Sequence, residues 1–253
     1  MKKALTIAGF DPTGGAGIQA DLKVFNSFGV YGLSVVSALT AQNTKGVKEV
    51  LPITPVFLKK QLSVLLSDVQ TDAVKIGMVY SEKNAAVIEW IIEKYSLKNI
   101  VLDPLILSSS GKRLVKEKAV TAIVRKLFPL CKVVTPNIDE ASALTGIEII
   151  NEKDMEKAAI CLKGFGPENV IITGGHLDKT AADIFYNGKF HYLIGKKIDG
   201  EFHGTGCAFS SAITAFLAKG ENALESARLA KNFMNKALRK SFYLGKGMMI
   251  LDI

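Results

Sequence analysis

The chain has 253 residues, of which 48% are hydrophobic and 22% charged, a composition typical of a globular protein with one large α/β domain. The formal net charge is +8, but the lysines are scattered, and the sequence has neither a block of like charges typical of a nucleic-acid surface nor an apolar run long enough to span a membrane. Three cysteines without a CxxC spacing argue against a disulfide framework or a zinc site, and the start MKKALTIAGF lacks the cleavage region of a signal peptide. We therefore expect a cytoplasmic protein with a single domain over residues 1–253 and no nucleic-acid or membrane partner.

Short apolar runs alternate with amphipathic helical patterns through the first two thirds of the chain. The apolar runs predict strands at 4–8, 33–39, 73–76, 99–102, 132–135 and 169–173. The 3.6-residue patterns predict helices at 18–28, 54–69, 81–95, 116–128, 139–144 and 152–165. Thr54 and Ser81 are the expected N-caps of two of these helices. This alternation indicates a mainly parallel sheet covered by helices on both faces.

The pattern changes near residue 182. Two strand-like runs, 182–186 and 190–194, flank Asn187-Gly188, and Asn-Gly between such runs is a strong hairpin signal. Helices are expected at 207–218 and 223–241. The sequence therefore predicts an α/β fold with an antiparallel hairpin added to a mostly parallel central sheet.

Polar residues and glycines gather where the predicted strands end. Ligands of open parallel sheets bind at these carboxyl ends. The turns in question are 9–17, 42–44, 75–78, 103–105, 136–140 and 174–176. We expect the functional site to lie among them.

The segment HGTGC, from His203 to Cys207, is the strongest local motif. Its glycines allow close approach of the backbone to a ligand, and the helix that follows presents free N–H groups and a positive dipole end. Such a turn suits a transferring phosphoryl group. A plain loop with Thr205 as helix N-cap is the alternative. Cys207 at the helix start is expected to have a lowered pKa, which suits a base or nucleophile, unless it is a buried inert thiol.

Two acidic residues at strand ends, and one early in a helix, are candidate ligands or structural groups. Asp103 and Glu140 have the hard oxygens that Mg²⁺ prefers, although Glu140 is also spaced from Asn137 as in a capping box. Asp21 follows a glycine turn that is neither a Walker A loop nor GxGxxG, and an ordinary exposed carboxylate is its alternative reading.

Seven motifs in this order resemble one family. They are TIAGFDPTGGAGIQADLK, SALTAQNT, VKIGM, VLDP, TPNIDEASALTG, ITGGHL and HGTGC. Together they are similar to the bacterial hydroxymethylpyrimidine kinase / phosphomethylpyrimidine kinase of thiamine synthesis, a member of the ribokinase-like superfamily. The resemblance implies a three-layer α/β/α sandwich, usually a homodimer, that transfers phosphate from ATP to a ring hydroxymethyl group and then to the resulting monophosphate.

The resemblance also implies residue roles. The residues that match positions around the pyrimidine are Gly9, Asp21, Gln42 and Met78. Asn137 and Glu140 match the motif that positions Mg²⁺ and the nucleotide phosphates, with Asp103 nearby. Gly204, Thr205 and Gly206 match the anion hole, and Cys207 matches the proton acceptor for the hydroxymethyl group.

The chain departs from the family pattern at its expected phosphate-binding lysines. Thr173 stands where a lysine usually precedes GGH, and the segment after Asp103-Pro104 has Lys112 following Gly111 instead of Lys-Ser-Gly. Lys75 or Lys112 are candidates to compensate. A pyridoxal kinase of the same superfamily and a non-catalytic pyrimidine sensor are the competing functions.

Overall fold

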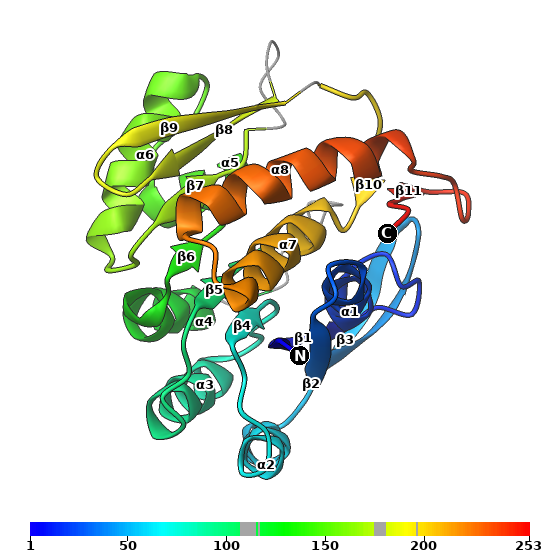
Figure 1. The fold of residues 1–253 in the computed structure, drawn as a ribbon, viewed down its shortest axis with the longest axis vertical. Helices are drawn as coiled ribbons and strands as arrows, with labels where there is room; N and C mark the ends of the chain where they lie inside the picture. The colour runs from blue at the N-terminus through cyan, green and yellow to red at the C-terminus, as the bar shows by residue number, and fades with distance from the viewer. Residues whose placement is uncertain (107–114, 116, 175–180, 196) are drawn as a thin grey trace.

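The computed structural model describes residues 1–106, 115, 117–174, 181–195 and 197–253. Lys112 and His176, both considered from the sequence, lie outside these ranges. Figure 1 shows the chain as a central sheet with helices on either side.

The central sheet has nine strands in the order β3-β2-β1-β4-β5-β6-β7-β8-β9. Six neighbouring strands run parallel to one another: β2, β1, β4, β5, β6 and β7. Strand β3 pairs antiparallel with β2, β8 with β7, and β9 with β8. Their bounds are β1 Lys3–Phe10, β2 Tyr31–Asn43, β3 Gly46–Pro52, β4 Ala73–Ile76, β5 Ile100–Leu102, β6 Val133–Val134, β7 Val170–Ile172, β8 Ala181–Tyr186 and β9 Phe190–Gly195. The predicted parallel sheet and the hairpin at Asn187-Gly188 are confirmed.

Helices cover both faces of the sheet, which makes the predicted three-layer α/β/α sandwich. One face packs against α2 Pro55–Leu66, α3 Glu82–Lys94, α4 Glu117–Ala122, α5 Ile138–Thr145 and α6 Glu152–Gly164. The other face packs against α1 Gly17–Ser27, α7 Thr205–Lys219 and α8 Ala223–Arg239, seen at the front of Figure 1. Strand side chains alternate between the two cores, so Leu5 and Ile7 join the first while Ala4 joins the second. Each fully buried Leu or Ile contributes about 1.5–3 kcal/mol.

Local signals explain where several helices begin. The side chain of Thr54 accepts the Phe57 amide N–H, and the side chain of Ser81 accepts that of Asn84, so both predicted N-caps are confirmed. Pro55 occupies the first turn of α2, where its missing N–H has no cost.

Two expectations about secondary structure were wrong. Strand β3 was not predicted, because its exposed Lys48 and Glu49 give an edge strand a polar appearance. The helix expected at 116–128 is α4 followed by a π-helical turn at Ile123–Leu127 and a 3₁₀ turn at Phe128–Leu130. Pro129 has no N–H to continue an α-helix.

The last segment of the chain returns to the N-terminal end of α7. Strand β11, Met249–Ile250, pairs in parallel with β10, Phe202–His203. The C-terminus therefore lies beside the HGTGC turn (Figure 1). Among the described residues, none of the helices combines the length and the apolar character that a membrane crossing requires.

Candidate active site

The glycine turn between β1 and α1 is closed by backbone contacts that only glycine allows. Gly17 has φ +60°, and a Cβ there would lie 2.3 Å from the Gly9 carbonyl oxygen. Asp11 organises this turn by accepting the amide N–H groups of Thr13 and Ala16, each at 2.8 Å. The turn is therefore rigid, and it places the Gly9 backbone at the end of β1.

Asp11 also links this turn to two distant parts of the chain. Its Oδ2 lies 2.8 Å from His203 Nε2, and Gln42 Nε2 lies 3.5 Å from the same ring nitrogen. Burial opposes ionisation of Asp11, but hydrogen bonds from His203, the Thr13 backbone and the Gln42 amide lower its pKa to about 2. The carboxylate is therefore ionised at neutral pH.

Gly9, Gln42 and Met78 belong to this same end of the sheet. A Cβ on Gly9 would lie 3.4 Å from the Met78 sulfur, so the two are neighbours. Gln42 reaches the cluster through Asp11 and His203, as described above. The structure therefore gathers three of the four residues that the resemblance places around the ring.

Asp21, the fourth residue that the resemblance places around the ring, forms a fully buried ion pair. Lys75 Nζ is 2.9 Å from both carboxylate oxygens of Asp21, and neither side chain is exposed. The Thr6 hydroxyl donates to Asp21 at 2.6 Å, and the Ser211 hydroxyl donates at 2.7 Å. The expectation of an exposed carboxylate is wrong. Direct contact of Asp21 with a ring is also disfavoured, because these partners occupy its oxygens; instead Asp21 ties α7 to β1 and β4.

The start of α7 has the backbone geometry expected of an anion hole. Gly204 is the N-cap, with φ +79° and no side-chain cap, so the alternative in which Thr205 caps the helix is wrong. A Cβ on Gly204 would lie 1.8 Å from the Gly15 carbonyl oxygen, which means that this turn packs directly on the first glycine turn. The first amides of α7, from Thr205 onward, have no partner within the helix.

Asp103 stands next to this helix start. A Cβ on Gly206 would lie 3.4 Å from Asp103 Oδ2, and the Ser210 hydroxyl is also 3.4 Å from that oxygen. Burial raises the pKa of Asp103 to about 6, against the attraction of Lys75. A buried carboxylate with a raised pKa is a site where a further positive charge would be stabilising.

The Cys207 thiol differs from expectation. Burial raises its pKa to about 12, although Lys75 and the Gly17 amide act in the opposite direction. The predicted lowering by the helix dipole is therefore wrong, because desolvation outweighs the dipole. The thiol is protonated at neutral pH.

Asn137, Glu140 and Thr173 lie together at the ends of β6 and β7. Asn137 and Glu140 form a complete capping box, with side-chain to backbone distances of 2.9 and 3.0 Å. Thr173 is bridged to Asn137, and Glu140 Oε1 accepts the Ile106 N–H at 3.1 Å. The structural reading of this motif is thus confirmed, and it also connects the cluster to the turn after Asp103.

Asp103 and Glu140 are the carboxylates that the sequence predicts as Mg²⁺ ligands. Mg²⁺ commonly uses one or two carboxylates with substrate phosphates. Among the described residues, no group of three or more His, Cys, Asp or Glu side chains could hold a metal. A dedicated cage is therefore not present in that part of the chain, and both oxygens of Glu140 accept backbone N–H groups.

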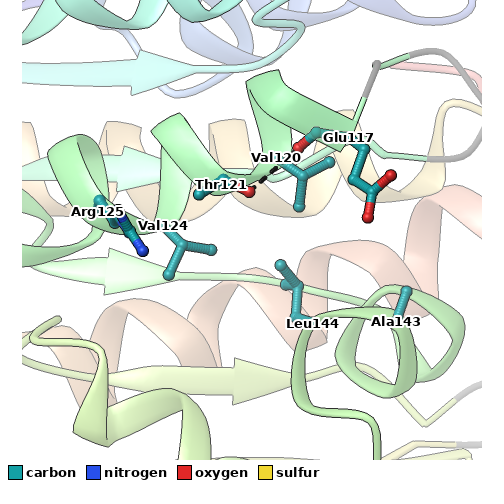
Figure 2. A pocket seen from close by; sticks show the side chains of 7 residues that line it. All are labelled: Glu117, Val120, Thr121, Val124, Arg125, Ala143 and Leu144. Atoms are coloured by element: carbon teal, nitrogen blue, oxygen red, sulfur yellow. Dashed lines mark hydrogen bonds between the residues drawn. The ribbon is translucent and has the colours of Figure 1, made fainter.

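A surface hollow of about 310 Å³ lies elsewhere, between α4, the π-helical turn and α5. Figure 2 shows its lining of Glu117, Val120, Thr121, Val124, Arg125, Ala143 and Leu144. None of the predicted site residues lines it. Its lining contains no glycine, so we do not assign it to phosphate chemistry.

A family model described as phosphomethylpyrimidine kinase matches residues 11–252. The chain belongs to the phosphomethylpyrimidine kinase family. The hydroxymethylpyrimidine/phosphomethylpyrimidine kinase of Aquifex aeolicus is 39% identical over 98% of this chain and 99% of its own length. The bifunctional thiamine biosynthesis protein ThiED of Geobacter sulfurreducens is 42% identical over 96% of this chain, which spans only 50% of that protein.

Solved structures place this family member among ribokinase-like kinases. The ADP complex of Bacillus subtilis pyridoxal kinase has a TM-score of 0.93 and 37% identity over 99% of this chain and 97% of that one. The predicted fold and the phosphotransferase class are therefore confirmed.

Sequence reasoning missed two members of this site. Asp11 was not considered as a site residue, and His203 was named only as the first residue of HGTGC. The signal available in the sequence was that each residue stands at the start of a glycine turn. Their hydrogen bond joins residues 192 positions apart, so it depends on the tertiary fold and the sequence could not show it.

Proposed function

We propose that this protein transfers the γ-phosphate of ATP to the hydroxymethyl group of 4-amino-5-hydroxymethyl-2-methylpyrimidine, and then phosphorylates the monophosphate, in thiamine synthesis. The observation that carries this proposal is the packing of the Gly204 turn on the Gly15 turn, which brings an uncapped helix start to the residues expected around the ring. The names of the relatives support the same activity.

The reacting groups have defined roles in this proposal. Gly204, Thr205 and Gly206 present backbone N–H groups to the transferring phosphoryl group. The hydroxymethyl oxygen forms a bond to the γ-phosphorus as the bond to the ADP oxygen breaks. Its proton passes to the Cys207 sulfur in the small fraction of molecules that hold the thiolate at neutral pH, since burial raises the pKa of this thiol. Because the transition state of phosphoryl transfer is loose, positioning contributes more than early proton removal.

The ring is held by Gly9, Gln42 and Met78. Asp21 holds α7 in place by accepting the hydrogen bond of the Ser211 hydroxyl. Asn137, Glu140 and Thr173 lie on the nucleotide side. Asp103 and Glu140 would hold Mg²⁺, which would supply positive charge to stabilise the phosphates. Lys75 does not replace the missing phosphate lysines, since it is fully buried against Asp21.

A pyridoxal kinase remains the second candidate, because the Bacillus subtilis pyridoxal kinase superposes so closely. Both rings are flat and bear a hydroxymethyl arm. A non-catalytic sensor is the third, and substrate-dependent ATP turnover would exclude it.

We also propose that the protein acts as one kinase domain in a cytoplasmic homodimer. Leu39 and Leu51 face each other on the β2–β3 ribbon and are 40% and 61% exposed, which makes this ribbon the candidate contact. Light scattering of the wild type and of Leu51→Lys tests it: a wild-type monomer would contradict the dimer.

The deciding experiment measures ADP release with Mg²⁺-ATP and, in parallel, the aminopyrimidine alcohol, its monophosphate and pyridoxal. We expect the highest kcat/KM with the pyrimidine alcohol and measurable turnover of the monophosphate. A higher kcat/KM with pyridoxal would overturn the assignment in favour of the second candidate.

A further inference from the structure

A hydrogen bond between Asp11 and His203 joins the two glycine turns of the site, and the proposed transfer step gives neither residue a role. Asp11 begins the turn between β1 and α1, whereas His203 ends β10 and directly precedes Gly204, the N-cap of α7. Asp11 Oδ2 lies 2.8 Å from His203 Nε2. The two residues are only 3% and 8% exposed, so water has little access to this bond.

Asp11 is the acceptor of this bond. Its pKa is lowered to about 2, so the carboxylate is ionised at neutral pH and has no proton to donate. His203 Nε2 therefore carries the proton, and a bond of this kind to a charged acceptor is stronger than one between neutral groups. The Gln42 amide nitrogen is farther from Nε2, at 3.5 Å, and the buried Nδ1 has no partner in the part of the chain that the structure describes. The bond to Asp11 is thus the shortest polar contact that orients the ring.

The other bonds of Asp11 fix its carboxylate to its own turn. Oδ1 accepts the amide N–H of Thr13 at 2.8 Å and its hydroxyl at 2.9 Å, and Oδ2 accepts the amide N–H of Ala16 at 2.8 Å. Each oxygen therefore faces at least one N–H donor, so neither can become an NH₂ group without setting two donors against each other. The position to which His203 is bound is defined by the first glycine turn itself.

The imidazole also packs directly on that turn. A Cβ on Gly15 would lie 2.8 Å from His203 Cδ2 and 3.3 Å from Ile250 Cδ1. Ile250 is the residue of β11 that pairs with His203. On its other side, the Gly15 carbonyl oxygen meets Gly204, where a Cβ would lie at 1.8 Å. Gly15 is therefore enclosed by three residues, and the start of α7 moves away from the first turn only if the contacts of His203 open.

We propose that Asp11 and His203 are positioning residues that hold the start of α7 on the first glycine turn, so that the amides of the Gly204 turn face the phosphoryl group during transfer. This inference rests on the proposed function, because it assigns those amides to that step. Donors aimed at a transferring group act mainly in the transition state, whereas other residues bind the ring and ADP in the proposed function. Loss of the pair should therefore slow transfer and leave both dissociation constants nearly unchanged.

Three variants break or keep the bond, and a fourth is the matched control. His203→Leu removes the donor but keeps an apolar side chain of similar bulk, and Asp11→Asn opposes the donors of its own turn. His203→Gln keeps a side-chain N–H and serves as the conservative rescue. Asp72→Asn is the control: Asp72 likewise accepts a backbone amide, that of Lys3 at 2.8 Å, and the Lys2 ammonium at 3.0 Å, but at the first residues of β1.

The first measurement is single-turnover transfer from Mg²⁺-ATP to the aminopyrimidine alcohol, with calorimetric dissociation constants for the alcohol and for Mg²⁺-ADP. We expect the rate to fall at least about tenfold in His203→Leu and in Asp11→Asn, with both dissociation constants within about threefold of wild type. The double variant should be no more than about threefold slower than the slower single variant, because the two residues act as one unit. His203→Gln and Asp72→Asn should stay within about threefold of the wild-type rate.

The second measurement does not depend on activity. Cys207 lies in the first turn of α7 and is 5% exposed, whereas Cys131 is 1% exposed in the core on the other face of the sheet. Iodoacetamide labelling of the folded, ligand-free protein, mapped by mass spectrometry, reports the opening of each region. We expect labelling of Cys207 to be at least about tenfold faster in His203→Leu and Asp11→Asn, with Cys131 unchanged. A general loss of stability would instead speed the labelling of both thiols alike.

The proposal is overturned if Cys207 is labelled no faster than in the wild type, or if Cys131 accelerates by the same factor. It is also overturned if an active wild type and both bond-breaking variants transfer phosphate at equal rates. If the wild type transfers phosphate to no ring, the proposed function fails, and selective labelling of Cys207 still decides whether the pair holds α7 on the first turn.

Discussion

Removing the positive charge of Lys75 is expected to destabilise the protein strongly. The Lys75–Asp21 pair is completely buried, with Nζ 2.9 Å from both carboxylate oxygens. Burial opposes the charged form of Lys75, but the charge of Asp21 raises its pKa above the ordinary value. In Lys75→Met the carboxylate of Asp21 stays buried with only the Thr6 and Ser211 hydroxyls as donors.

The expected loss is about 3–5 kcal/mol of unfolding free energy, the usual cost of leaving one buried charge without its partner. This is a large share of the roughly 5–15 kcal/mol by which native domains are stable. Adding Asp21→Asn removes the orphaned charge and keeps the shape. The double variant is therefore expected to recover at least about 1.5 kcal/mol of that loss.

Equilibrium denaturation in urea, followed by circular dichroism, measures these free energies. Lys126→Met is the control, because Lys126 pairs with Glu89 at 2.7 Å but both side chains are partly exposed, 36% and 28%. Its loss should stay below about 1 kcal/mol. The reasoning is refuted if Lys75→Met costs no more than this control, or if the double variant is as unstable as Lys75→Met.

Three further predictions concern the start of α7. Gly204→Ala should lower kcat at least about a hundredfold and reduce Tm, since its Cβ would meet the Gly15 carbonyl at 1.8 Å; near-normal kcat would contradict this. Asp103→Asn should abolish Mg²⁺-dependent turnover. It should also stabilise the fold at pH 7, because the pKa of Asp103 is raised from 3.8 to about 6 in the folded protein. The wild type therefore loses stability as the pH rises from 3.8 through about 6, and the variant does not. Parallel pH–stability curves for wild type and variant would refute that account. Because the pKa of Cys207 is raised to about 12, its thiolate fraction and hence kcat should rise with pH between 7 and 9, and a flat profile would argue against the thiolate.

Much of the fold follows from local sequence signals. The strand at Ala73–Ile76 has the predicted bounds, and the caps Thr54 and Ser81 are where the side-chain chemistry places them. These features depend on neighbours within a few residues. Strand β3 could not be predicted from the apolar pattern, because it is an edge strand that pairs only with β2 and has exposed residues.

The site was harder to predict, for a different physical reason. The glycine turns could be recognised because Gly17 and Gly204 need positive φ angles, which is a local property. The partner of Asp21 is 54 residues away, so the sequence could not show that this carboxylate is buried against Lys75. Likewise, the dipole at Cys207 is a local effect, whereas the burial that outweighs it depends on the whole fold.

The most direct test of the central claim compares the wild type with Cys207→Ala, using the aminopyrimidine alcohol and Mg²⁺-ATP in a single-turnover measurement. We predict efficient transfer by the wild type and a loss of at least about a hundredfold in the variant, with the dissociation constant for the alcohol changed less than about threefold. Wild-type transfer rates in Cys207→Ala would contradict the account of this helix start as the place where the phosphoryl group and the proton change partners.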